Sequence, residues 1–426
     1  MQRTLEQWLA YQQHVHPQEI DLGLDRVREV WQRMGSPRAP RNLIVGGTNG
    51  KGSTVALLEA MLRCAGYRVG AYTSPHLLRY NERVRIDGCE ADDAAWCDAF
   101  ARIESARSGT PLTYFEFGTL AALDLFARAG VDVAVLEVGL GGRLDATNII
   151  DADAAIVTTV DLDHQDWLGP DRDHIGMEKG GIARPGRPLI IGESDPPAGL
   201  LRAVLERGAV LVRQGIQYRM VDRRDGWSWE HVDGTRLELP PPLIDAPVQK
   251  ANAAAALAAL HALRSVLPCT PGALADGVAG AQVPGRLQRL PGPPEVILDV
   301  AHNVQAARVL AQWLGDHPME GRVHAVFGAL RDKDVAGILD VLGPCVEHWH
   351  LAGLEAETAR GRTAAELEHA LAPTKPRDAH ATVAQALDAA LRARPARIVA
   401  FGSFYLVAAV WRELNNPGGS ATHGTS

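Results

Sequence analysis

The feature that most restricts the fold of this chain is a regular alternation of short apolar runs with helical patterns over almost all of its 426 residues. The clearest run, Val131–Val138, is nearly unbroken, which is typical of a strand that a parallel sheet buries on both faces. Helical patterns are expected at Thr54–Cys64 and Gly118–Ala129. Further strands are expected at Leu43–Val45, Tyr67–Tyr72, Ala154–Val160 and Pro188–Gly192. The alternation predicts an α/β fold with a doubly wound sheet.

A change of pattern divides the chain into two predicted domains, as its length also suggests. Val210–Leu239 alternates polar and apolar residues around Asp-Gly turns, which predicts a small antiparallel insertion. Ala251–Leu263 is predicted as a helix, and the domain boundary is placed at Pro284-Gly285. Beyond it, strands are expected at Glu295–Val300, Val323–Phe327, His348–Leu351 and Ile398–Phe401. The predicted units are an N-terminal domain over residues 1–283, a Rossmann-like α/β domain over 284–414, and a disordered tail over 415–426.

The composition argues against several classes of function. A net charge of -8 is unusual for a nucleic-acid-binding protein, which needs a basic face for phosphates. The five cysteines are scattered and form no CxxC pair, so we expect reduced thiols in a cytoplasmic protein. The polar N-terminus and the lack of an apolar run of about 20 residues predict neither a signal peptide nor a membrane span.

A glycine-rich loop, Gly46–Ser53, lies between a predicted strand and a predicted helix. Its glycines let backbone N–H groups surround phosphate oxygens, and Lys51 adds a charge for the β- and γ-phosphates. The match to the usual pattern is imperfect, because Val45 replaces the first glycine and Gly52 separates Lys51 from the hydroxyl of Ser53. The alternative interpretation is a glycine-rich turn with a solvated lysine.

Two polar residues follow other predicted strands. Glu137 ends the buried run, where an ionised carboxylate needs a partner such as Mg²⁺ beside the phosphates, or else a buried salt bridge. His164 lies beyond a strand's carboxyl end, where open α/β sheets bind ligands. A structural histidine is the alternative for His164.

Other polar residues have weaker signals of their own. Lys179 is most simply a surface residue of a helix. Asp299 and His302 follow the first predicted strand of the second domain, where they could contact a ribose and a phosphate. Arg286 could reach a nucleotide or be a surface charge, and Asn303 could cap a helix.

Nine motifs occur in order and span the chain from about Asp21 to Phe404. They are Gly47–Ser53 (GTNGKGS), Thr73–Leu77 (TSPHL), Glu82–Arg85 (ERVR), Tyr114–Thr119 (YFEFGT), Glu137–Asn148 (EVGLGGRLDATN), Asp163–Gly169 (DHQDWLG), Glu178–Gly181 (EKGG), Pro284–Gln288 (PGRLQ) and Asp299–Asn303 (DVAHN). This set resembles the folylpolyglutamate synthase family of Mur-type ligases, most closely its bifunctional bacterial members. The resemblance implies an N-terminal P-loop domain and a C-terminal Rossmann-like domain, with ATP bound in the cleft between them.

The resemblance also implies roles for individual residues. The triphosphate would be bound by Gly50, Lys51, Gly52 and Ser53, and the rest of the nucleotide by Asn252, Arg286 and Asp299. The magnesium ligands would be Ser74, Glu137, His164 and Lys179, the last as a carbamate formed with CO₂ near a second ion. The catalytic set would be Lys51, Glu137, His164, Lys179 and His302.

Three further segments resemble the parts that hold the pterin in the bifunctional bacterial enzymes. Their predicted substrate contacts are Leu22, Gly23, Leu24, Thr113, Phe115, Asp145 and Ala146. The implied substrates are dihydropteroate, reduced folates, L-glutamate and ATP, and the resemblance favours a monomer. The chain departs from the family at Gly180, usually alanine, and at Pro247–Ala251, where the family has a histidine. Glycine at position 180 could loosen the helix that carries Lys179 by roughly 1 kcal/mol.

The implied reaction converts a carboxylate into an acyl phosphate, which the glutamate amine then attacks. Two alternatives have different consequences. A peptidoglycan precursor ligase usually has a further N-terminal domain for its UDP-sugar substrate, and about forty residues before the loop are too few for one. A P-loop switch protein would hydrolyse ATP slowly, indifferent to a pterin acid, and would leave Glu137, His164 and the Asp299–His302 pair without a joint task.

Overall fold

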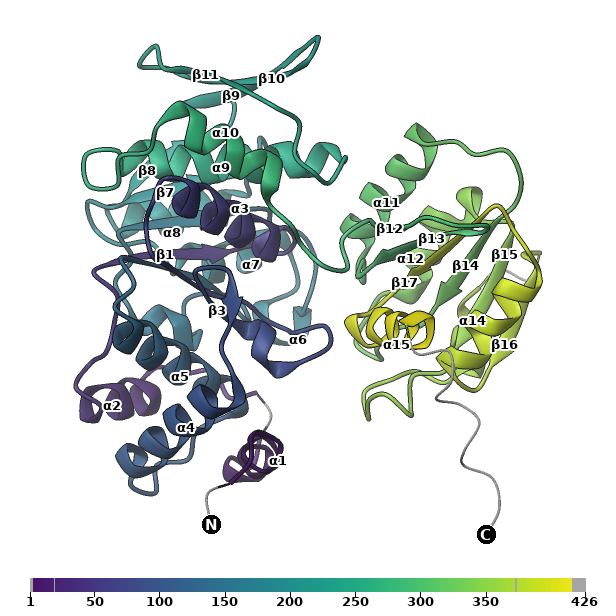
Figure 1. Ribbon diagram of the computed structural model, residues 1–426, viewed down its shortest axis with the longest axis horizontal. Coiled ribbons are helices and arrows are strands. Elements are labelled where there is room, and N and C mark those ends of the chain that lie inside the picture. The colour runs from purple at the N-terminus through teal and green to yellow at the C-terminus, as the bar shows by residue number, and fades with distance from the viewer. Residues whose placement is uncertain (1–2, 19, 372–373, 416–426) are drawn as a thin grey trace. The chain divides into compact units, whose positions relative to one another are not determined.

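The computed structural model describes residues 3–18, 20–371 and 374–415 (Figure 1). By their internal contacts the residues form two compact units, Met1–Val283 and Pro284–Ser426. Both units are α/β, so the predicted fold class is confirmed. Among the described residues, no helix combines the length and the apolar character needed to cross a membrane.

The first unit is built on an eight-stranded sheet of the described residues, in the order β4-β3-β2-β5-β1-β6-β7-β8. Its strands are β1 (Arg41–Gly46), β2 (Val69–Tyr72), β3 (Val84–Ile86), β4 (Cys89–Glu90), β5 (Val133–Glu137), β6 (Ala154–Val157), β7 (Pro188–Ile191) and β8 (Val210–Arg213). The strands from β2 to β8 in this order are parallel, and β3 and β4 are antiparallel at one edge. The central strand β1 has β5 on one side and β6 on the other.

Helices cover both faces of this sheet (Figure 1). They are α1 (Leu5–Val15), α2 (Asp25–Arg33), α3 (Lys51–Cys64), α4 (Asp93–Arg107), α5 (Tyr114–Ala129), α6 (Gln165–Leu168), α7 (Arg172–Gly180), α8 (Ala198–Glu206), α9 (Pro247–Ala262) and α10 (Pro271–Gly280), with short 3₁₀ turns at Tyr80–Arg83 and Ala146–Ile149. Successive side chains of one strand enter different cores. Leu43 and Val45 pack in the core that includes α3, α9 and α10, whereas Ile44 packs in the core that includes α4 and α5. Burial on both faces explains the unbroken apolar runs of the sequence.

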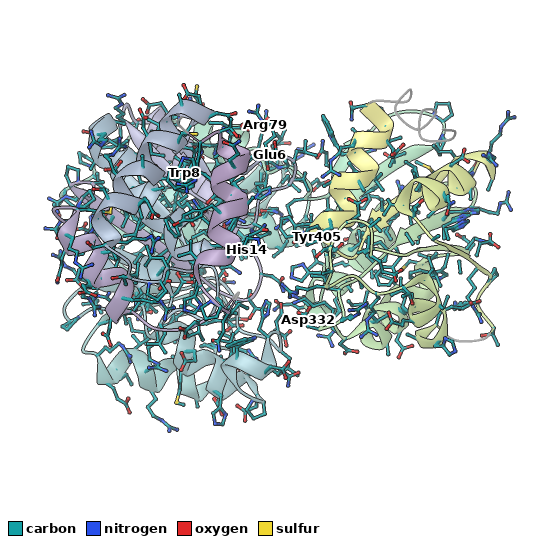
Figure 2. The ribbon with its side chains drawn as sticks, turned by 90° about the horizontal axis from the view of Figure 1, so that it is seen from below. Glu6, Trp8, His14, Arg79, Asp332 and Tyr405 are labelled. Carbon is teal, nitrogen blue, oxygen red and sulfur yellow. The ribbon has the colours of Figure 1, made fainter. Side chains whose placement is uncertain are left out.

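Helix α1 packs in the core that includes α4 and α5. Trp8, labelled in Figure 2, is 5% exposed, and its ring lies 6.0 Å from the ring of Phe100 on α4. Thr4 and Gln7 cap the helix reciprocally, so α1 begins where its sequence supplies both partners of a capping box.

The antiparallel insertion is smaller than predicted. Val210–Arg213 is β8, which pairs in parallel with β7 at the edge of the main sheet, so its assignment to the insertion is wrong. The antiparallel sheet contains only β9 (Tyr218–Arg223), β10 (Gly226–His231) and β11 (Arg236–Leu239) among the described residues. The sequence could not separate β8 from them, because an apolar period of two identifies a strand but not its partner.

The second unit contains a six-stranded sheet of the described residues, in the order β12-β13-β17-β14-β15-β16. Its strands are β12 (Gln288–Leu290), β13 (Glu295–Asp299), β14 (Val323–Phe327), β15 (His348–Ala352), β16 (Arg377–His380) and β17 (Arg397–Phe401). Its helices are α11 (Val304–Asp316), α12 (Val335–Leu342), α13 (Ala364–Ala370), α14 (Val383–Arg392) and α15 (Phe404–Asn415), with a 3₁₀ turn at Gly343–Cys345. Among the described strands of this unit, only β12 is antiparallel to its neighbour.

Two details of the second unit differ from the predictions. The strand that ends at Asp299 is the second of the unit, because the short β12 precedes it. The predicted disordered tail cannot begin at Asn415, which is the last residue of α15. The remainder of that tail, residues 416–426, lies outside the described residues.

Candidate active site

The glycine-rich loop joins the carboxyl end of β1 to α3, and close contacts require two of its glycines. Gly47 has a φ of 144° and Gly50 a φ of 84°, both in the left-handed region. A Cβ atom on Gly47 would lie 1.8 Å from Thr158 Oγ1, and one on Gly50 would lie 2.5 Å from Asn252 Oδ1. The loop therefore follows this path only if both residues lack a side chain.

Lys51 is the first residue of α3 and is held over the loop. Its Nζ donates hydrogen bonds to the carbonyl oxygens of Gly47 and Thr48, both at 3.1 Å. Lys51 is partly buried, and these two hydrogen bonds hold its amine over the loop. The amino end of α3 adds partial positive charge at the same place, which favours an anion there.

The segment that follows β6 is tied to this loop. Thr48 N donates to Thr159 O at 2.7 Å, and Asn49 N donates to Thr159 Oγ1 at 3.2 Å. In return, Thr158 Oγ1 donates to Asn49 O at 2.6 Å, and Asp161 N donates to Thr48 Oγ1 at 3.0 Å. These hydrogen bonds hold the backbone that leads to His164 against the glycine-rich loop.

Glu137 is the last residue of β5, next to β1 in the sheet, and its side chain is buried. Its Oε2 accepts a hydrogen bond from Ser74 N at 3.1 Å. A Cβ atom on Gly52 would lie 3.6 Å from the same oxygen, so the carboxylate lies against the first turn of α3. A buried carboxylate and a serine hydroxyl are hard oxygen donors, and their place beside the loop fits a magnesium ion.

His164 and Lys179 occupy different environments. His164 is the N-cap of α6 with a φ of 52°, and its side chain is about a third exposed, with Nε2 3.9 Å from Asp163 Oδ1. Lys179 lies on α7 and is only 4% exposed, so its interpretation as a surface residue is wrong. Burial and the positive charge of Lys51 lower the pKa of Lys179 to about 7, against the opposing effect of Asp163. Near neutral pH a large fraction of this side chain is therefore a neutral amine.

Helix α9 contributes a buried amide pair to the loop. Asn252, predicted to bind the nucleotide, donates through Nδ2 to Gln249 Oε1 at 3.2 Å. Gln249 Nε2 in turn donates to Ser53 Oγ at 3.3 Å. No sequence pattern indicates a role for Gln249, although it lies three residues before Asn252 and therefore on the same face of the helix.

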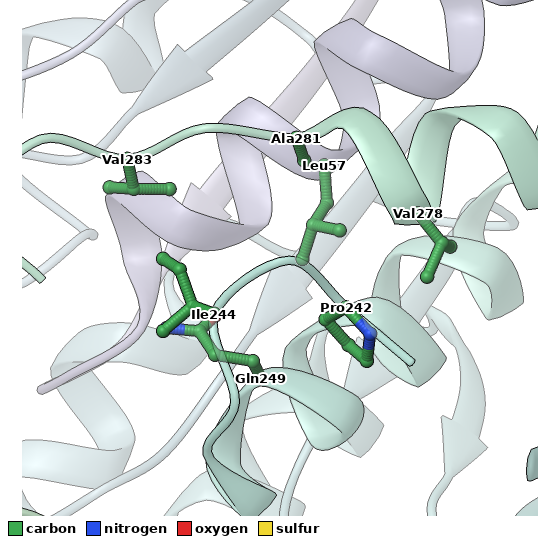
Figure 3. Close-up of a pocket in the computed structure, with 7 residues that line it drawn as sticks. All are labelled: Leu57, Pro242, Ile244, Gln249, Val278, Ala281 and Val283. Atoms are coloured by element: carbon green, nitrogen blue, oxygen red, sulfur yellow. The ribbon is translucent and has the colours of Figure 1, made fainter. Parts of the chain in front are cut away.

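A small pocket beside Gln249 has a volume of about 10 Å³, room for no more than a single water molecule (Figure 3). The other residues that line it are Leu57, Pro242, Ile244, Val278, Ala281 and Val283. Its size and its apolar walls exclude it as the place where a pterin binds.

The second unit brings three predicted residues together. Asp299, at the end of β13, is buried and accepts hydrogen bonds from Leu287 N and Ala301 N, both at 2.8 Å. Burial raises the pKa of its carboxyl group, and the charge of Arg286 opposes this. Phe404 was not predicted, yet its ring lies 5.0 Å from the Arg286 guanidinium and 6.2 Å from the His302 ring. No pattern in the sequence indicates Phe404, since it only begins a helix.

Asn303 has the capping role that the sequence offered as an alternative. Its side chain accepts a hydrogen bond from Ala306 N at 3.0 Å at the start of α11. The helix therefore begins directly after the DVAHN motif.

Two of the predicted pterin segments are joined by ion pairs. Arg26 Nε lies 2.9 Å from Glu116 on α5, and the Arg26 guanidinium also pairs with Asp21. Thr113 caps α5, because its N–H donates to Glu116 Oε2 at 2.7 Å and its Oγ1 accepts from Glu116 N. The segment with Leu22, Gly23 and Leu24 is thereby held near the start of α5.

Asp145 organises the loop that follows β5. Its Oδ2 accepts from Gly139 N at 3.0 Å and Leu140 N at 2.9 Å, and its Oδ1 accepts from the Thr147 hydroxyl at 2.7 Å. Burial raises the pKa of this carboxyl group, while these hydrogen bonds lower it. A Cβ atom on Gly139 would lie 2.6 Å from Phe115 Cζ, so the Phe115 ring covers the loop. The substrate contacts of Asp145, the buried Ala146 and Phe115 stay predictions.

A glycine-rich loop between a strand and the amino end of a helix, with a buried carboxylate beside it, is typical of one class of protein, the P-loop enzymes that use ATP. Two family models match the chain: the Mur ligase middle domain over residues 45–212, and the Mur ligase, glutamate ligase domain, over residues 285–404. The dihydrofolate synthase/folylpolyglutamate synthase of Escherichia coli (strain K12) is 48% identical over 414 residues, which are 96% of each chain.

Solved structures agree with this assignment. E. coli FolC in complex with DHPP and ADP matches with a TM-score of 0.92 and 46% identity, over 97% of this chain and 98% of that chain. A bifunctional folylpolyglutamate synthase/dihydrofolate synthase with Mn, AMPPNP and L-glutamate bound matches with a TM-score of 0.89 and 45% identity, at the same coverage. The chain belongs to the dihydrofolate synthase/folylpolyglutamate synthase family of Mur ligases. It is an ATP-dependent ligase, as the resemblance implied.

Proposed function

We propose that the enzyme joins L-glutamate to dihydropteroate, which makes dihydrofolate, and to reduced folates, which extends their glutamate chain. The nucleotide, DHPP and L-glutamate named with the related structures support these substrates. The single observation in this chain that carries the proposal is Lys179, a buried amine with a pKa of about 7 that the charge of Lys51 influences. A P-loop protein that only binds a nucleotide has no use for such an amine.

The reaction needs two steps because a free carboxylate is a poor electrophile. A carboxylate oxygen of the pterin acid attacks the γ-phosphorus of ATP, the bond to ADP breaks, and an acyl phosphate forms. The α-amine of glutamate then attacks the acyl carbon, an amide forms, and phosphate and a proton leave. Lys51 and the N–H groups of Gly50, Gly52 and Ser53 would hold the phosphates and offset the repulsion between the two anions.

We assign the magnesium ligands to Glu137, Ser74 and His164. Glu137 and Ser74 are supported by their shared hydrogen bond and by the position of the carboxylate beside Gly52. When bound, the metal supplies positive charge that stabilises the phosphoryl oxygens. Glu137 and Ser74 fix where that charge lies relative to Lys51.

We further propose that Lys179 carries a carbamate and serves a second ion. The neutral amine attacks CO₂, a C–N bond forms, and the amine loses a proton. This step requires an unprotonated amine, which the lowered pKa of Lys179 supplies near neutral pH. The product is an anion that takes the place of a neutral amine, and in this buried position it would need a metal ion beside it.

The remaining predicted residues are assigned to substrates. Asn252 would contact the nucleotide from α9, supported by its hydrogen bond to Gln249 and its place at the loop. In the second unit, Arg286, Asp299 and His302 would also contact the nucleotide, since they form one cluster with Phe404.

For the pterin, we propose contacts with the following residues: Leu22, Gly23, Leu24, Thr113, Phe115, Asp145 and Ala146. The two ion pairs of Arg26 and the hydrogen bonds of Asp145 support a preformed site there. We expect the enzyme to act as a monomer in the cytoplasm, where its five free thiols would stay reduced.

The test is phosphate release from MgATP with L-glutamate, adding dihydropteroate or tetrahydrofolate in separate reactions. Release with both acceptors supports both activities, and release with one assigns the enzyme to that acceptor. Lys179→Ala should abolish turnover. Lys250→Ala is the matched control, because Lys250 pairs with Asp222 on an exposed surface at 2.8 Å and should leave turnover unchanged. Phosphate release that neither acceptor stimulates would refute the proposal.

A further inference from the structure

Three neighbouring strands of the second unit present histidines on one face of their sheet. On β15, His348 and His350 are separated by one residue, and on β16 Asp378 and His380 are separated in the same way. Side chains two apart in a strand point to the same face. His350 is opposite Asp378 in the register, and His348 is opposite His324 of β14. The parallel pairing of β14, β15 and β16 (Figure 1) therefore gathers these side chains.

The side chains are close enough to share one ion. His348 Nε2 lies 2.8 Å from Asp378 Oδ2. One ligand atom each from His348, His350 and Asp378 lie within 4.8 Å of one another. His324 Nδ1 lies 3.1 Å from His350 Nε2, which leaves Nδ1 of His350 for another partner.

Buried ring nitrogens in this cluster lack partners. His324 and His350 are each 2% exposed, and neither His324 Nε2 nor His350 Nδ1 has a hydrogen-bond partner among the described residues. The same holds for His380 Nε2. A buried polar atom without a partner is costly, and a ring nitrogen with an unused electron pair suits a cation.

We propose that His348, His350 and Asp378 form a binding site for a divalent transition-metal ion of the zinc class. Imidazole nitrogens with one carboxylate are typical zinc ligands, whereas Mg²⁺ prefers oxygen donors such as Glu137. Three protein ligands leave one position of a tetrahedral ion open. The His348 and Asp378 side chains are 27% and 57% exposed, which gives an ion access from solvent.

A neighbouring histidine supports the site. His324 Nδ1 lies 3.1 Å from His350 Nε2, so His324 would help to fix the orientation of the His350 ring, as hydrogen-bonded neighbours of metal ligands do.

A second group in the first unit, His231, Asp233 and His261, is a weaker candidate. Asp233 already accepts from His261 Nε2 at 2.9 Å and from Thr235 N at 3.0 Å, and Arg264 lies 3.5 Å from the same carboxylate. No ring nitrogen of His231 or His261 is among the described buried atoms that lack a partner. This group therefore serves as an internal control.

The test is a Zn²⁺ titration of the full-length, untagged chain against a chromophoric chelator, with excess Mg²⁺ present. The variants are His348→Gln and Asp378→Asn, with His231→Gln as the control. We expect one tight site in the wild type and in His231→Gln, weakened at least about tenfold in the other two variants. Zn²⁺ should also raise the Tm of the wild type and not that of Asp378→Asn.

Two results would overturn the proposal. One is the lack of a tight zinc site in the wild type. The other is a site that His231→Gln removes while His348→Gln and Asp378→Asn retain it. Asp378→Asn keeps the shape of an exposed side chain, so the variant should fold, and its phosphate release without Zn²⁺ should equal that of the wild type.

Discussion

Gly180 is the last residue of α7 and lies against α8, so replacing it with alanine should destabilise the first unit. A Cβ atom at this position would lie 2.8 Å from Ala203 Cβ and 3.2 Å from Leu200 Cδ1. Carbon atoms in good contact are about 3.5 to 4.0 Å apart, so the two helices must separate. From the sequence alone, this glycine is expected to loosen the helix that carries Lys179. In the structure the glycine instead permits a close contact between helices.

The magnitude follows from two opposing effects. Forcing a methyl group into a packed contact costs about 1 to 3 kcal/mol. Alanine gains at most about 1 kcal/mol of helix propensity over glycine, and less at the last residue of a helix. The free energy of unfolding should therefore fall by about 1 to 2 kcal/mol, which lowers the Tm by roughly 2 to 6 °C.

A double-mutant cycle with Ala203→Gly provides the assay. Ala203→Gly alone should lose stability through helix propensity, and the double variant Gly180→Ala/Ala203→Gly should lose less than the sum of the single changes. Thermal unfolding by circular dichroism should give a coupling energy of about 1 kcal/mol or more. Phosphate release should fall in Gly180→Ala and recover in the double variant, because the contact positions Lys179. Additive effects, or a higher Tm for Gly180→Ala, would refute the packing explanation.

Three further changes have distinct expected outcomes. Lys179→Met should abolish phosphate release and yet stabilise the metal-free protein. A folded pKa of about 7 against 10.5 unfolded makes folding release a proton between pH 7 and 10.5, so wild-type stability rises with pH over this range. In chemical denaturation, the increase in the free energy of unfolding caused by Lys179→Met should thus shrink from at most about 5 kcal/mol at pH 6 to about 2 kcal/mol at pH 9. An increase that does not depend on pH would contradict the buried amine. Gly47→Ala should lose measurable ADP binding in calorimetry, because its Cβ would lie 1.8 Å from Thr158 Oγ1, and retained affinity would disprove the contact. Asp145→Asn should lower the free energy of unfolding by about 2 to 3 kcal/mol and raise the KM for dihydropteroate, because an amide cannot accept all the hydrogen bonds of the carboxylate. If Asp145→Asn keeps both the wild-type free energy of unfolding and the wild-type KM for dihydropteroate, Asp145 does not have this role.

Much of the fold could be predicted because strands buried on both faces have a strong sequence signal. Val131–Val138 predicted β5, and the loop after Leu43–Val45 predicted the turn into α3. The pairing of strands could not be predicted in the same way. Val210–Arg213 has the composition of an insertion strand, and only tertiary contacts show that it extends the main sheet.

A candidate site residue could be predicted where its residue type is unusual for its position in the sequence pattern. A carboxylate at the end of an apolar run identified Glu137, and its burial beside the loop is now visible. Lys179 had no such signal, because an amphipathic helix pattern does not reveal that another helix covers the lysine. Gln249 and Phe404 were missed for a similar reason, since their relevance depends on neighbours distant in sequence.

The hydrogen bonds between residues 46–49 and 158–161 have a consequence for how the gene can change. Connections between strands and helices usually tolerate insertions and deletions. Here the Thr48 hydroxyl donates to Asp161 O at 3.1 Å and accepts from Asp161 N at 3.0 Å. One residue added to either connection would move the hydrogen-bonding groups of that connection away from their partners on the other. A scan of single-residue insertions should therefore find residues 47–49 and 158–161 as intolerant as the interior of β1, although they lie outside any strand or helix.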